Sequence, residues 1–427
     1  MSTAVKRTIQ TIEQVVKVLP VGTNLALVRL MWAMVNGSFL QSRGAVHSAL
    51  AASGFANHEI RRSWRALWRG VWSIDELTIR WRQQVEKEAL WQPRIYEGYR
   101  VLSVDITSFW RPKLQHWYGR FYHRLANRLM PGVGFGIVAQ IGSIDRKRIP
   151  LLKRIIRTTK NDDDEENLQT TILKQVPTFQ EEDEIFVHDA GITILQVQEA
   201  KIPRYVIRIP NNCTARRNEL PAPKKRGRPA EYGEIVRPLA RSYRGREIPA
   251  TQADESTQFE FAGRTIEAKG WFDVVRSDQK VAAQNETFDI WVFRDPLFDK
   301  PLAVGLKVKV SAESSFRIYL DRWPVEQPPL VAKQMLGLHR QFVFAPVSCQ
   351  RLPELALLTG NILTYLAATL PPIPSGYWDR RPKKHLVGCD VIWQRVIFQK
   401  ITLLLVEFEK RNQLRPIYQR ELMPIDV

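Results

Sequence analysis

The stretch from Tyr319 to Lys333, YLDRWPVEQPPLVAK, carries the pattern that decides the expected fold. If it is helical, the side chains 3, 7 and 14 residues after Tyr319 project at about 300°, 340° and 320° from it. These side chains are Arg322, Glu326 and Lys333. All four then share one narrow face, on which an acid lies beside two cations and an aromatic ring. Such a face suits a metal-binding carboxylate flanked by phosphate-binding groups.

Three prolines bear on this helix. Pro324 fits a first helical turn, where no backbone N–H is needed. Pro328 and Pro329 each remove a helix hydrogen bond and disfavour helical geometry in the preceding residue. They predict a kink just after Glu326, or a helix that begins later than the pattern suggests.

Two further carboxylates stand at the ends of β-rich apolar runs. Asp105 follows Val101–Val104, and Asp189 follows Ile185–His188, with glycine turning the chain soon after it. Carboxylates at strand ends can converge and hold two divalent cations, which activate a water or a 3′-hydroxyl for phosphodiester displacement. His188 precedes Asp189 on the same strand and points to the other face, so we expect it to be packed or solvated rather than catalytic.

The spacing Tyr-x2-Arg-x3-Glu-x6-Lys resembles the YREK signature of bacterial insertion-sequence transposases with a DDE catalytic triad, in all four residues and all three spacings. Asp105-Ile106-Thr107 resembles the Asp-x-Thr at the first acid of that family. The interval of 137 residues from Asp189 to Glu326 is similar in length to the interval in which that family carries a β-rich insertion. Alternating runs at 288–293 and 302–310 predict strands inside it.

The resemblance implies an α/β fold in which a ribonuclease-H-like catalytic core carries an inserted β-rich domain and helical N- and C-terminal regions. The implied segments are a helical DNA-binding domain (1–95), the first part of the core (96–204), the β-rich insertion with a basic hook-like loop (205–300), the second part of the core (301–345) and a helical C-terminal region (346–427).

The resemblance also implies a Mg²⁺-dependent enzyme that cleaves transposon ends and joins them to target DNA, with a DNA hairpin as one route. Asp105, Asp189 and Glu326 would bind two Mg²⁺ ions, with Mn²⁺ as the substitute. Tyr319, Arg322 and Lys333 would hold the backbone phosphate and a flipped nucleotide. Trp291 or Trp271 would stack on that base, although packing in the core is the more common role of a tryptophan.

Composition agrees with a nucleic-acid partner. The chain has 427 residues and a net charge of +19, which favours a polyanion. Its three cysteines are far apart, which suits a reducing compartment. The N-terminus has no signal-peptide pattern, and the apolar run 355–370 is shorter than the roughly 20 residues of a membrane span. We expect a bacterial cytoplasmic, nucleoid-associated protein without a membrane partner.

The charge is densest around Lys224-Lys225-Arg226-Gly227-Arg228-Pro229. Glycine and proline disfavour regular structure here, so an exposed loop is expected. An extended Arg-Gly-Arg-Pro can lie in the DNA minor groove, in the manner of an AT-hook element. A solvated basic linker is the alternative.

The N-terminal hundred residues predict helices. One face, expected to be apolar, comprises Ile60, Trp64, Leu67, Trp68 and Val71; a neighbouring stripe comprises Arg61, Arg65 and Arg69. Ser73 and Glu76 predict a capping box that opens the next helix. The stripe favours DNA binding, whereas the alternative is a helical bundle with solubility charges.

Two molecules are expected to pair two transposon ends, so the resemblance implies a homodimer on duplex DNA that carries terminal inverted repeats. Two alternatives stay open. One is a transposase-derived DNA-binding protein without catalytic activity, and the other is a structure-specific nuclease on the same core.

Overall fold

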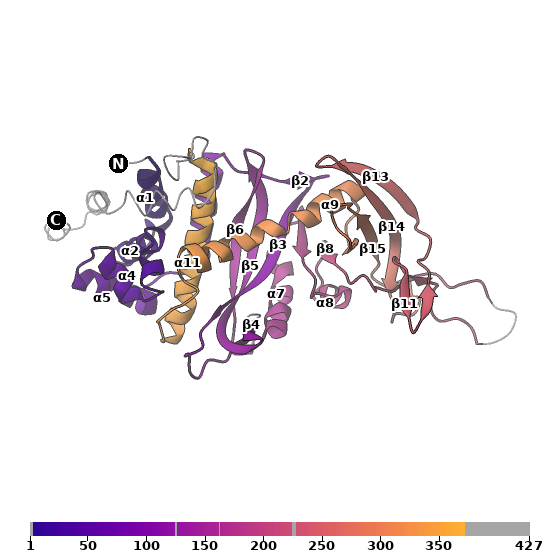
Figure 1. Cartoon of the computed structure of the whole chain (residues 1–427), viewed down its shortest axis with the longest axis horizontal. Helices are drawn as coiled ribbons and strands as arrows, with labels where there is room; N and C mark the ends of the chain where they lie inside the picture. Colours follow the sequence, from indigo (N-terminus) through magenta and orange to yellow (C-terminus); the bar gives the residue numbers. More distant parts are fainter. Residues whose placement is uncertain (1–2, 124–125, 162, 224–227, 372–427) are drawn as a thin grey trace. The chain divides into compact units, whose positions relative to one another are not determined.

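The computed structural model describes residues 3–123, 126–161, 163–223 and 228–371 (Figure 1). The chain forms two compact units. Unit 1 comprises Met1–Pro93, Ile106–Leu168 and Pro324–Val427, and unit 2 comprises Arg94–Asp105 and Gln169–Trp323. Helices and a mixed sheet together confirm the predicted α/β class.

Unit 1 begins with helices. They are α1 (Thr3–Val16), α2 (Thr23–Val35), α3 (Ser38–Gln41), α4 (Val46–Ala52), α5 (Asn57–Arg69) and α6 (Ile74–Glu88). Ser73 caps α6 by accepting the Glu76 N–H at 3.2 Å, which is one of the two bonds of the predicted capping box. One face of α6 is buried, from Ile74 and Leu77 to Trp81 and Val85.

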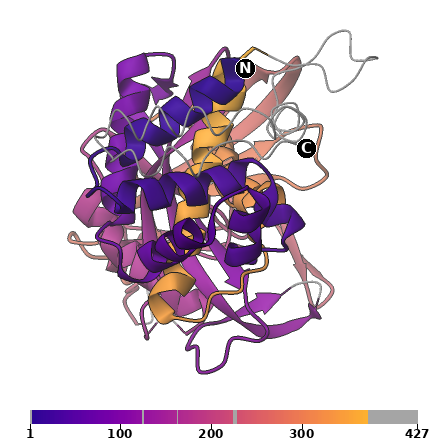
Figure 2. The same ribbon diagram turned by 90° about the vertical axis from the view of Figure 1, so that its left-hand side faces the viewer.

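The apolar run near residue 355 forms the buried helix α11 (Pro346–Thr369), around which the N-terminal helices gather (Figure 2). Its Asn361 accepts the indole N–H of Trp81 at 2.8 Å and the Leu152 N–H at 3.1 Å, and donates to the Pro150 carbonyl at 2.7 Å. The buried amide group of Asn361 is therefore satisfied within the fold. Among the described residues, no helix has the length and apolar content needed to cross a membrane.

The strands of unit 1 surround a long central strand. β5 (Arg128–Ile144) pairs antiparallel with β1 (Gln92–Pro93), β4 (Arg120–His123) and β6 (Lys147–Arg157). The end of β3 (Tyr99–Trp110) lies beside β5, since the Arg111 N–H donates to the Pro131 carbonyl at 2.6 Å. Both α6 and α11 pack on β6.

Unit 2 holds the beginning of β3 and a series of further strands. The strands are β2 (Ile95–Tyr96), β7 (Glu184–His188), β8 (Tyr205–Arg208), β9 (Ala215–Arg217), β10 (Ile235–Val236), β11 (Arg241–Tyr243), β12 (Arg246–Ile248), β13 (Glu255–Phe261), β14 (Arg264–Arg276), β15 (Phe288–Arg294) and β16 (Leu302–Leu306). The helices are α7 (Glu165–Phe179), which starts in unit 1, α8 (Ile194–Glu199) and α9 (Ala312–Leu320). The predicted strands at 288–293 and 302–310 are confirmed, with the second ending at Leu306.

Within unit 2, two kinds of strand pairing meet. β3 pairs parallel with β7, and β7 pairs parallel with β8. β8 then pairs antiparallel with β16, which continues antiparallel through β15 to β14. The sequence between Asp189 and α9 therefore supplies one further parallel strand and then mainly antiparallel β structure.

The predicted apolar face of α5 is partly wrong. Ile60 and Leu67 are buried, but Trp64 and Trp68 are exposed by 39% and 47%. The small side chains of Ser63 and Ala66 complete the buried face instead. Small residues allow the neighbouring α2 to approach closely, so the bulky indoles lie on the arginine side of the helix. The predicted Val71 lies beyond the end of α5 and is also exposed.

The stretch from Tyr319 to Lys333 is not one helix. α9 ends at Leu320, a 3-10 turn covers Trp323–Glu326, and α10 covers Gln327–Leu330. A π-helical turn, η3, covers Val331–Met335. The first break comes before Glu326 rather than just after it, and the predicted alternative of a helix that begins later is confirmed by the start of α10 at Gln327. Pro328 and Pro329 fall in the first turn of α10, where their missing N–H groups have no intrahelical partner to lose.

Candidate active site

Asp105 lies in β3, and Asp189 directly follows β7, the parallel neighbour of β3 in unit 2. The register of the two strands pairs Ser103 with Val187. Asp105 stands two residues after Ser103, and β3 continues beyond it to Trp110, so the prediction that Asp105 ends a strand is wrong. Asp189 stands two residues after Val187, immediately after the last residue of β7, as predicted.

Two residues of the YREK pattern meet Asp189. The Tyr319 hydroxyl donates to Asp189 Oδ1 at 2.9 Å, and an Arg322 guanidinium nitrogen lies 3.4 Å from Oδ2. Arg208 at the end of β8 lies 3.8 Å from Oδ1. The side chain of Arg322 is 3% exposed, so this cation is held inside the fold beside a half-exposed carboxylate. An aromatic hydroxyl and a buried cation from the end of α9 thus converge on the second predicted acid.

The chain around Arg322 is fixed from both sides. The Ser103 hydroxyl, on the same face of β3 as Asp105, donates to the Arg322 carbonyl at 3.0 Å. The neighbouring Asp321 is buried and accepts from Arg94 Nε at 2.7 Å and from the Tyr96 hydroxyl at 2.8 Å. These anchors determine where the turn after α9 places Arg322. Sequence reasoning missed Ser103, although its position two residues before Asp105 was a usable signal.

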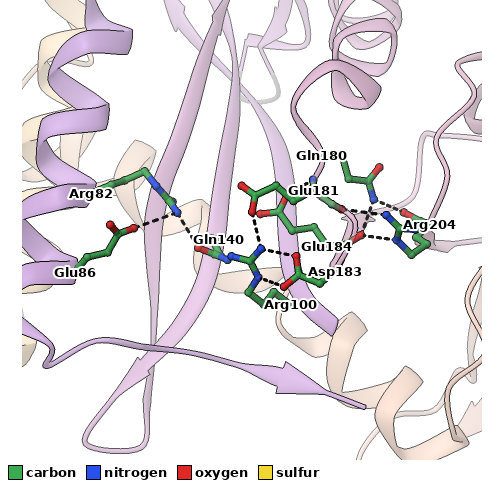
Figure 3. A network of polar contacts seen from close by, with 9 residues as sticks. All are labelled: Arg82, Glu86, Arg100, Gln140, Gln180, Glu181, Asp183, Glu184 and Arg204. Atoms are coloured by element: carbon green, nitrogen blue, oxygen red, sulfur yellow. Dashed lines mark hydrogen bonds and ion pairs between the residues drawn. The ribbon is translucent and has the colours of Figure 1, made fainter. Parts of the chain in front are cut away.

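The opposite end of the parallel strands is held by a second polar network (Figure 3). Arg100 of β3 bonds to Asp183 at 2.5 Å and to Glu181 at 2.6 Å, both just before β7. Gln180 donates at 2.8 Å to the carbonyls of Glu184 and Arg204. The starts of β3, β7 and β8 are therefore tied together.

Figure 3 also draws a polar contact of unit 1. Arg82 of α6 donates to Gln140 of β5 at 2.9 Å and lies 3.9 Å from Glu86 on its own helix. This contact ties α6 to the central strand of its unit.

The electrostatics of the unit 2 site favour an ionised acid beside a protonated phenol. Partial burial would by itself raise the pKa of Asp189. The pKa is nevertheless below its ordinary value, because hydrogen bonds and positive charges outweigh this effect. They come from the Ala190 N–H, the Arg322 guanidinium, the Tyr319 hydroxyl and the Arg208 guanidinium. Burial, with a contribution from Asp189, raises the pKa of Tyr319 to about 12. Tyr319 therefore remains a hydrogen-bond donor at neutral pH.

His188 is packed, one of the two alternatives expected from its position. Its ring stacks on Phe186 with centroids 6.0 Å apart, and Nδ1 lies 3.0 Å from the Asp189 carbonyl. Burial lowers the pKa of His188 to about 4, despite the opposing effect of Asp189. The imidazole is therefore neutral at physiological pH.

This buried imidazole predicts a pH dependence of stability. Between about pH 6.5 and pH 4 the unfolded chain binds a proton that folded His188 does not bind. The free energy of unfolding should therefore fall by up to about 3 kcal/mol as the pH drops through that window. Urea unfolding with a metal chelator present would measure it. His188→Gln should lose this part of the slope, and an unchanged slope would contradict the assignment. Asp189, with its lowered pKa, acts at lower pH.

Glu326 and Lys333 belong to unit 1, where the ammonium group of Lys333 forms cation–π contacts with two aromatic rings. Its ammonium lies 5.3 Å from the ring centroid of Phe109 and 5.1 Å from that of Trp110, both at the end of β3. The ring of His123 meets Trp110 edge-on at 4.5 Å. π faces hold a cation without neutralising its charge. Glu326 is half-buried in the 3-10 turn before α10.

The predicted stacking tryptophans are both buried. Trp271 donates its indole N–H to the Gln252 carbonyl at 3.0 Å, and Trp291 packs between Phe272 and Phe293. Their burial supports the packing role that is more common for tryptophan. Trp323, which sequence reasoning did not select, is 54% exposed, and the Arg322 guanidinium lies 4.4 Å from its ring centroid.

The predicted DNA-binding cations are distributed over both units. Lys224, Lys225 and Arg226 lie outside the described residues. Arg228 is exposed and forms an ion pair with Glu231. Arg61, Arg65 and Arg69 are exposed along α5, with the Arg69 guanidinium 4.1 Å from the ring centroid of Trp68.

The donor chemistry of Asp105 and Asp189 suits a hard divalent cation. Two carboxylates on adjacent strands repel each other unless a positive charge lies nearby, and carboxylate oxygen is the ligand that Mg²⁺ prefers. Asp189 already attracts Arg322 and Arg208. Within the described ranges, no group of three or more His, Cys, Asp or Glu side chains is arranged to hold a metal ion.

No protein-family model matches the chain, and no curated protein matches it.

Proposed function

We propose that the chain is a DDE transposase that binds transposon ends, cleaves them and joins them to target DNA. The observation that carries this proposal is the convergence of Tyr319 and Arg322 on Asp189. The spacing pattern selected the first two residues, and a strand-end pattern 130 residues earlier selected the acid. Two independent sequence patterns therefore meet in one cluster.

The strand arrangement supports a ribonuclease-H-like core. β3 lies beside β5, whose pairing with β6 is antiparallel, and on its other edge β3 pairs parallel with β7 and through it with β8. A mixed sheet with parallel strands and helices suits the α/β core that the resemblance implies. The mainly antiparallel strands that follow β8 suit the inserted β-rich domain.

In the proposed reaction, each of the three acids and the residues around them has a role. Asp105 and Asp189 would hold Mg²⁺ at the sheet edge, with Glu326 as the third acid. Two bound Mg²⁺ ions would supply a nucleophile and stabilise the leaving oxygen in phosphodiester displacement. Arg322 favours the ionised form of Asp189, and Tyr319 orients its carboxylate by donating a hydrogen bond to Oδ1. Lys333 would contribute a positive charge for the phosphate. Its cation–π contacts with Phe109 and Trp110 position the ammonium group.

The cation–π contact between Lys333 and Trp110 predicts that the loss of activity depends on which residue replaces Trp110. Trp110→Leu removes one π face and should lower kcat/KM for end cleavage by about 3- to 30-fold, as expected for about 0.5–2 kcal/mol of cation–π interaction. Trp110→Phe keeps a π face and should stay within about threefold of the wild type. Gel assays on purified variants would measure both. Equal losses in the two variants, with equal thermal stability, would contradict this role.

DNA contacts would extend beyond the core. The exposed arginines of α5 and the basic loop 224–228 are the candidates for contacts with the terminal inverted repeats. Because cut-and-paste chemistry needs both ends in one assembly, the active form would be a homodimer on DNA.

The test uses the DNA that flanks the gene, searched for inverted repeats. The purified chain is incubated with a duplex that carries such an end, with and without Mg²⁺, and with a target plasmid. The proposal expects binding in both conditions, Mg²⁺-dependent cuts at the end, and joined end–target products. Binding without any cut would favour a silent DNA-binding protein. Cuts that follow DNA structure, without joined products, would favour a structure-specific nuclease.

A further inference from the structure

A polar groove lies between α1 and α6 in unit 1, apart from every residue assigned above. It has a volume of about 310 Å³, and its lining includes three cations, Arg7, Lys17 and Lys87. Gln10, Gln14 and Gln84 line the space between them. The lining therefore consists mainly of hydrogen-bond donors with a surplus of positive charge.

The sequence of α1 explains why these residues share the groove. Positions 7, 10, 14 and 17 recur at helical spacing and so lie on one face. The other face carries Ile9, Ile12 and Val16, which are buried. The polar face of α1 meets Gln84 and Lys87, which are three residues apart on α6.

A buried network behind the groove orients two of its lining residues. Glu88 is 10% exposed and lies 2.5 Å from an Arg7 guanidinium nitrogen. It also accepts from Gln84 at 2.7 Å and from the Tyr365 hydroxyl at 2.6 Å. Tyr365 is buried in α11 and packs edge-on against Trp81 with centroids 5.2 Å apart. Glu88 therefore fixes the positions of Arg7 and Gln84. Surface charges that serve only solubility do not need such a network.

The charge balance of the groove favours an anion. Glu88 compensates Arg7, so Lys17 and Lys87 leave an excess of two positive charges. Ammonium groups with amide donors between them match the oxygens of a phosphate. A membrane-surface site would present large apolar side chains next to its cations, whereas the residues that line this groove are polar.

We propose that the α1–α6 groove binds backbone phosphates of duplex DNA. From Arg7 to Lys17 the helix extends about 15 Å, which on one DNA strand corresponds to about four phosphates. Such contacts fix the position of a protein on the duplex without reading its sequence. The inference shares with the proposed function only the premise that the partner is DNA, and it does not require that the chain cuts DNA.

The experiment compares two charge-matched double variants of the full chain. Lys17→Gln/Lys87→Gln removes the excess charge of the groove. Lys6→Gln/Arg80→Gln removes two exposed cations from the same two helices, and neither of these lines the groove. Affinity for a labelled duplex of arbitrary sequence is measured by fluorescence anisotropy over a range of salt concentrations. Mg²⁺-dependent cleavage of end DNA is recorded for the wild type in parallel.

The groove variant should lose about 10- to 100-fold in affinity at low salt, and the slope of log K against log salt should shrink by about one to two. The control variant should keep the wild-type slope. Equal losses in both variants, or a wild-type slope in the groove variant, would overturn the proposal. Saturable binding of inorganic phosphate that only the groove variant loses, with an unchanged DNA slope, would also overturn it. A wild type that binds DNA without cutting it would refute the transposase function and leave the groove result standing.

Discussion

Asp189→Asn is expected to lower the rate of Mg²⁺-dependent end cleavage by about 10³-fold or more, because residues that act as one catalytic unit show losses of this size. The amide keeps the size of the side chain and can still accept the Tyr319 hydroxyl, which lies 2.9 Å from Oδ1. What is lost is the negative charge of the carboxylate. Single-turnover cleavage on gels would measure the rate, and anisotropy would show whether end binding persists.

Asp183→Asn is the matched control for this variant. Asp183 is an aspartate of the same segment, also paired with an arginine, but it lies before β7 rather than after it. Its ion pair with Arg100 is partly exposed, so the substitution should cost about 1 kcal/mol of stability or less and leave cleavage within about twofold. Comparable losses in the two variants would mean that Asp189 acts through general stability and would contradict its catalytic role.

Arg29→Met should cause the largest loss of stability among the substitutions considered. Arg29 of α2 lies 2.6 Å from Glu59 of α5, and their side chains are 3% and 1% exposed. Removing the arginine leaves a carboxylate buried without its charge partner, which costs about 3–5 kcal/mol. Urea unfolding followed by circular dichroism should show the first transition at a clearly lower midpoint.

The double variant Arg29→Met/Glu59→Gln separates charge from packing. Glutamine removes the buried charge and can still accept the Ala56 N–H that Glu59 accepts at 2.9 Å. It should therefore recover about 2 kcal/mol or more relative to Arg29→Met. A double variant that is no more stable than the single one would show that the loss comes from packing, for example from the guanidinium 6.0 Å from the Phe55 ring centroid.

Local patterns in the sequence predicted much of the fold. The alternation at 288–293 and the apolar runs before Asp105 and Asp189 correspond to strands β15, β3 and β7, although β3 continues past Asp105 to Trp110. The Ser73 cap predicted the start of α6. These features depend on neighbours along the chain, where periodicity and capping chemistry act directly.

Features that depend on packing partners were not predictable. The indoles of Trp64 and Trp68 fit the apolar periodicity of α5, yet the close approach of α2 selects Ser63 and Ala66 for the buried face. The break after α9 depends on Asp321, which Arg94 and Tyr96 hold from more than 200 residues earlier in the chain. No local pattern reveals such a contact.

The candidate site shows the same division. The spacing of Tyr319, Arg322 and the strand-end position of Asp189 were visible in the sequence, but their mutual contact was not. The Ser103 hydroxyl that holds the Arg322 carbonyl also became evident only in the fold. For Lys333, the sequence indicated a charge on one helical face, whereas the fold adds the aromatic rings that fix its place.

The most direct test of the central claim is cleavage of a duplex carrying the inverted repeats that flank the gene, by the wild type and by Asp105→Asn, Asp189→Asn and Glu326→Gln. The account predicts that the wild type cuts in Mg²⁺ and that each variant binds the same duplex without cutting it. Mg²⁺-dependent cleavage that persists in all three variants would contradict it.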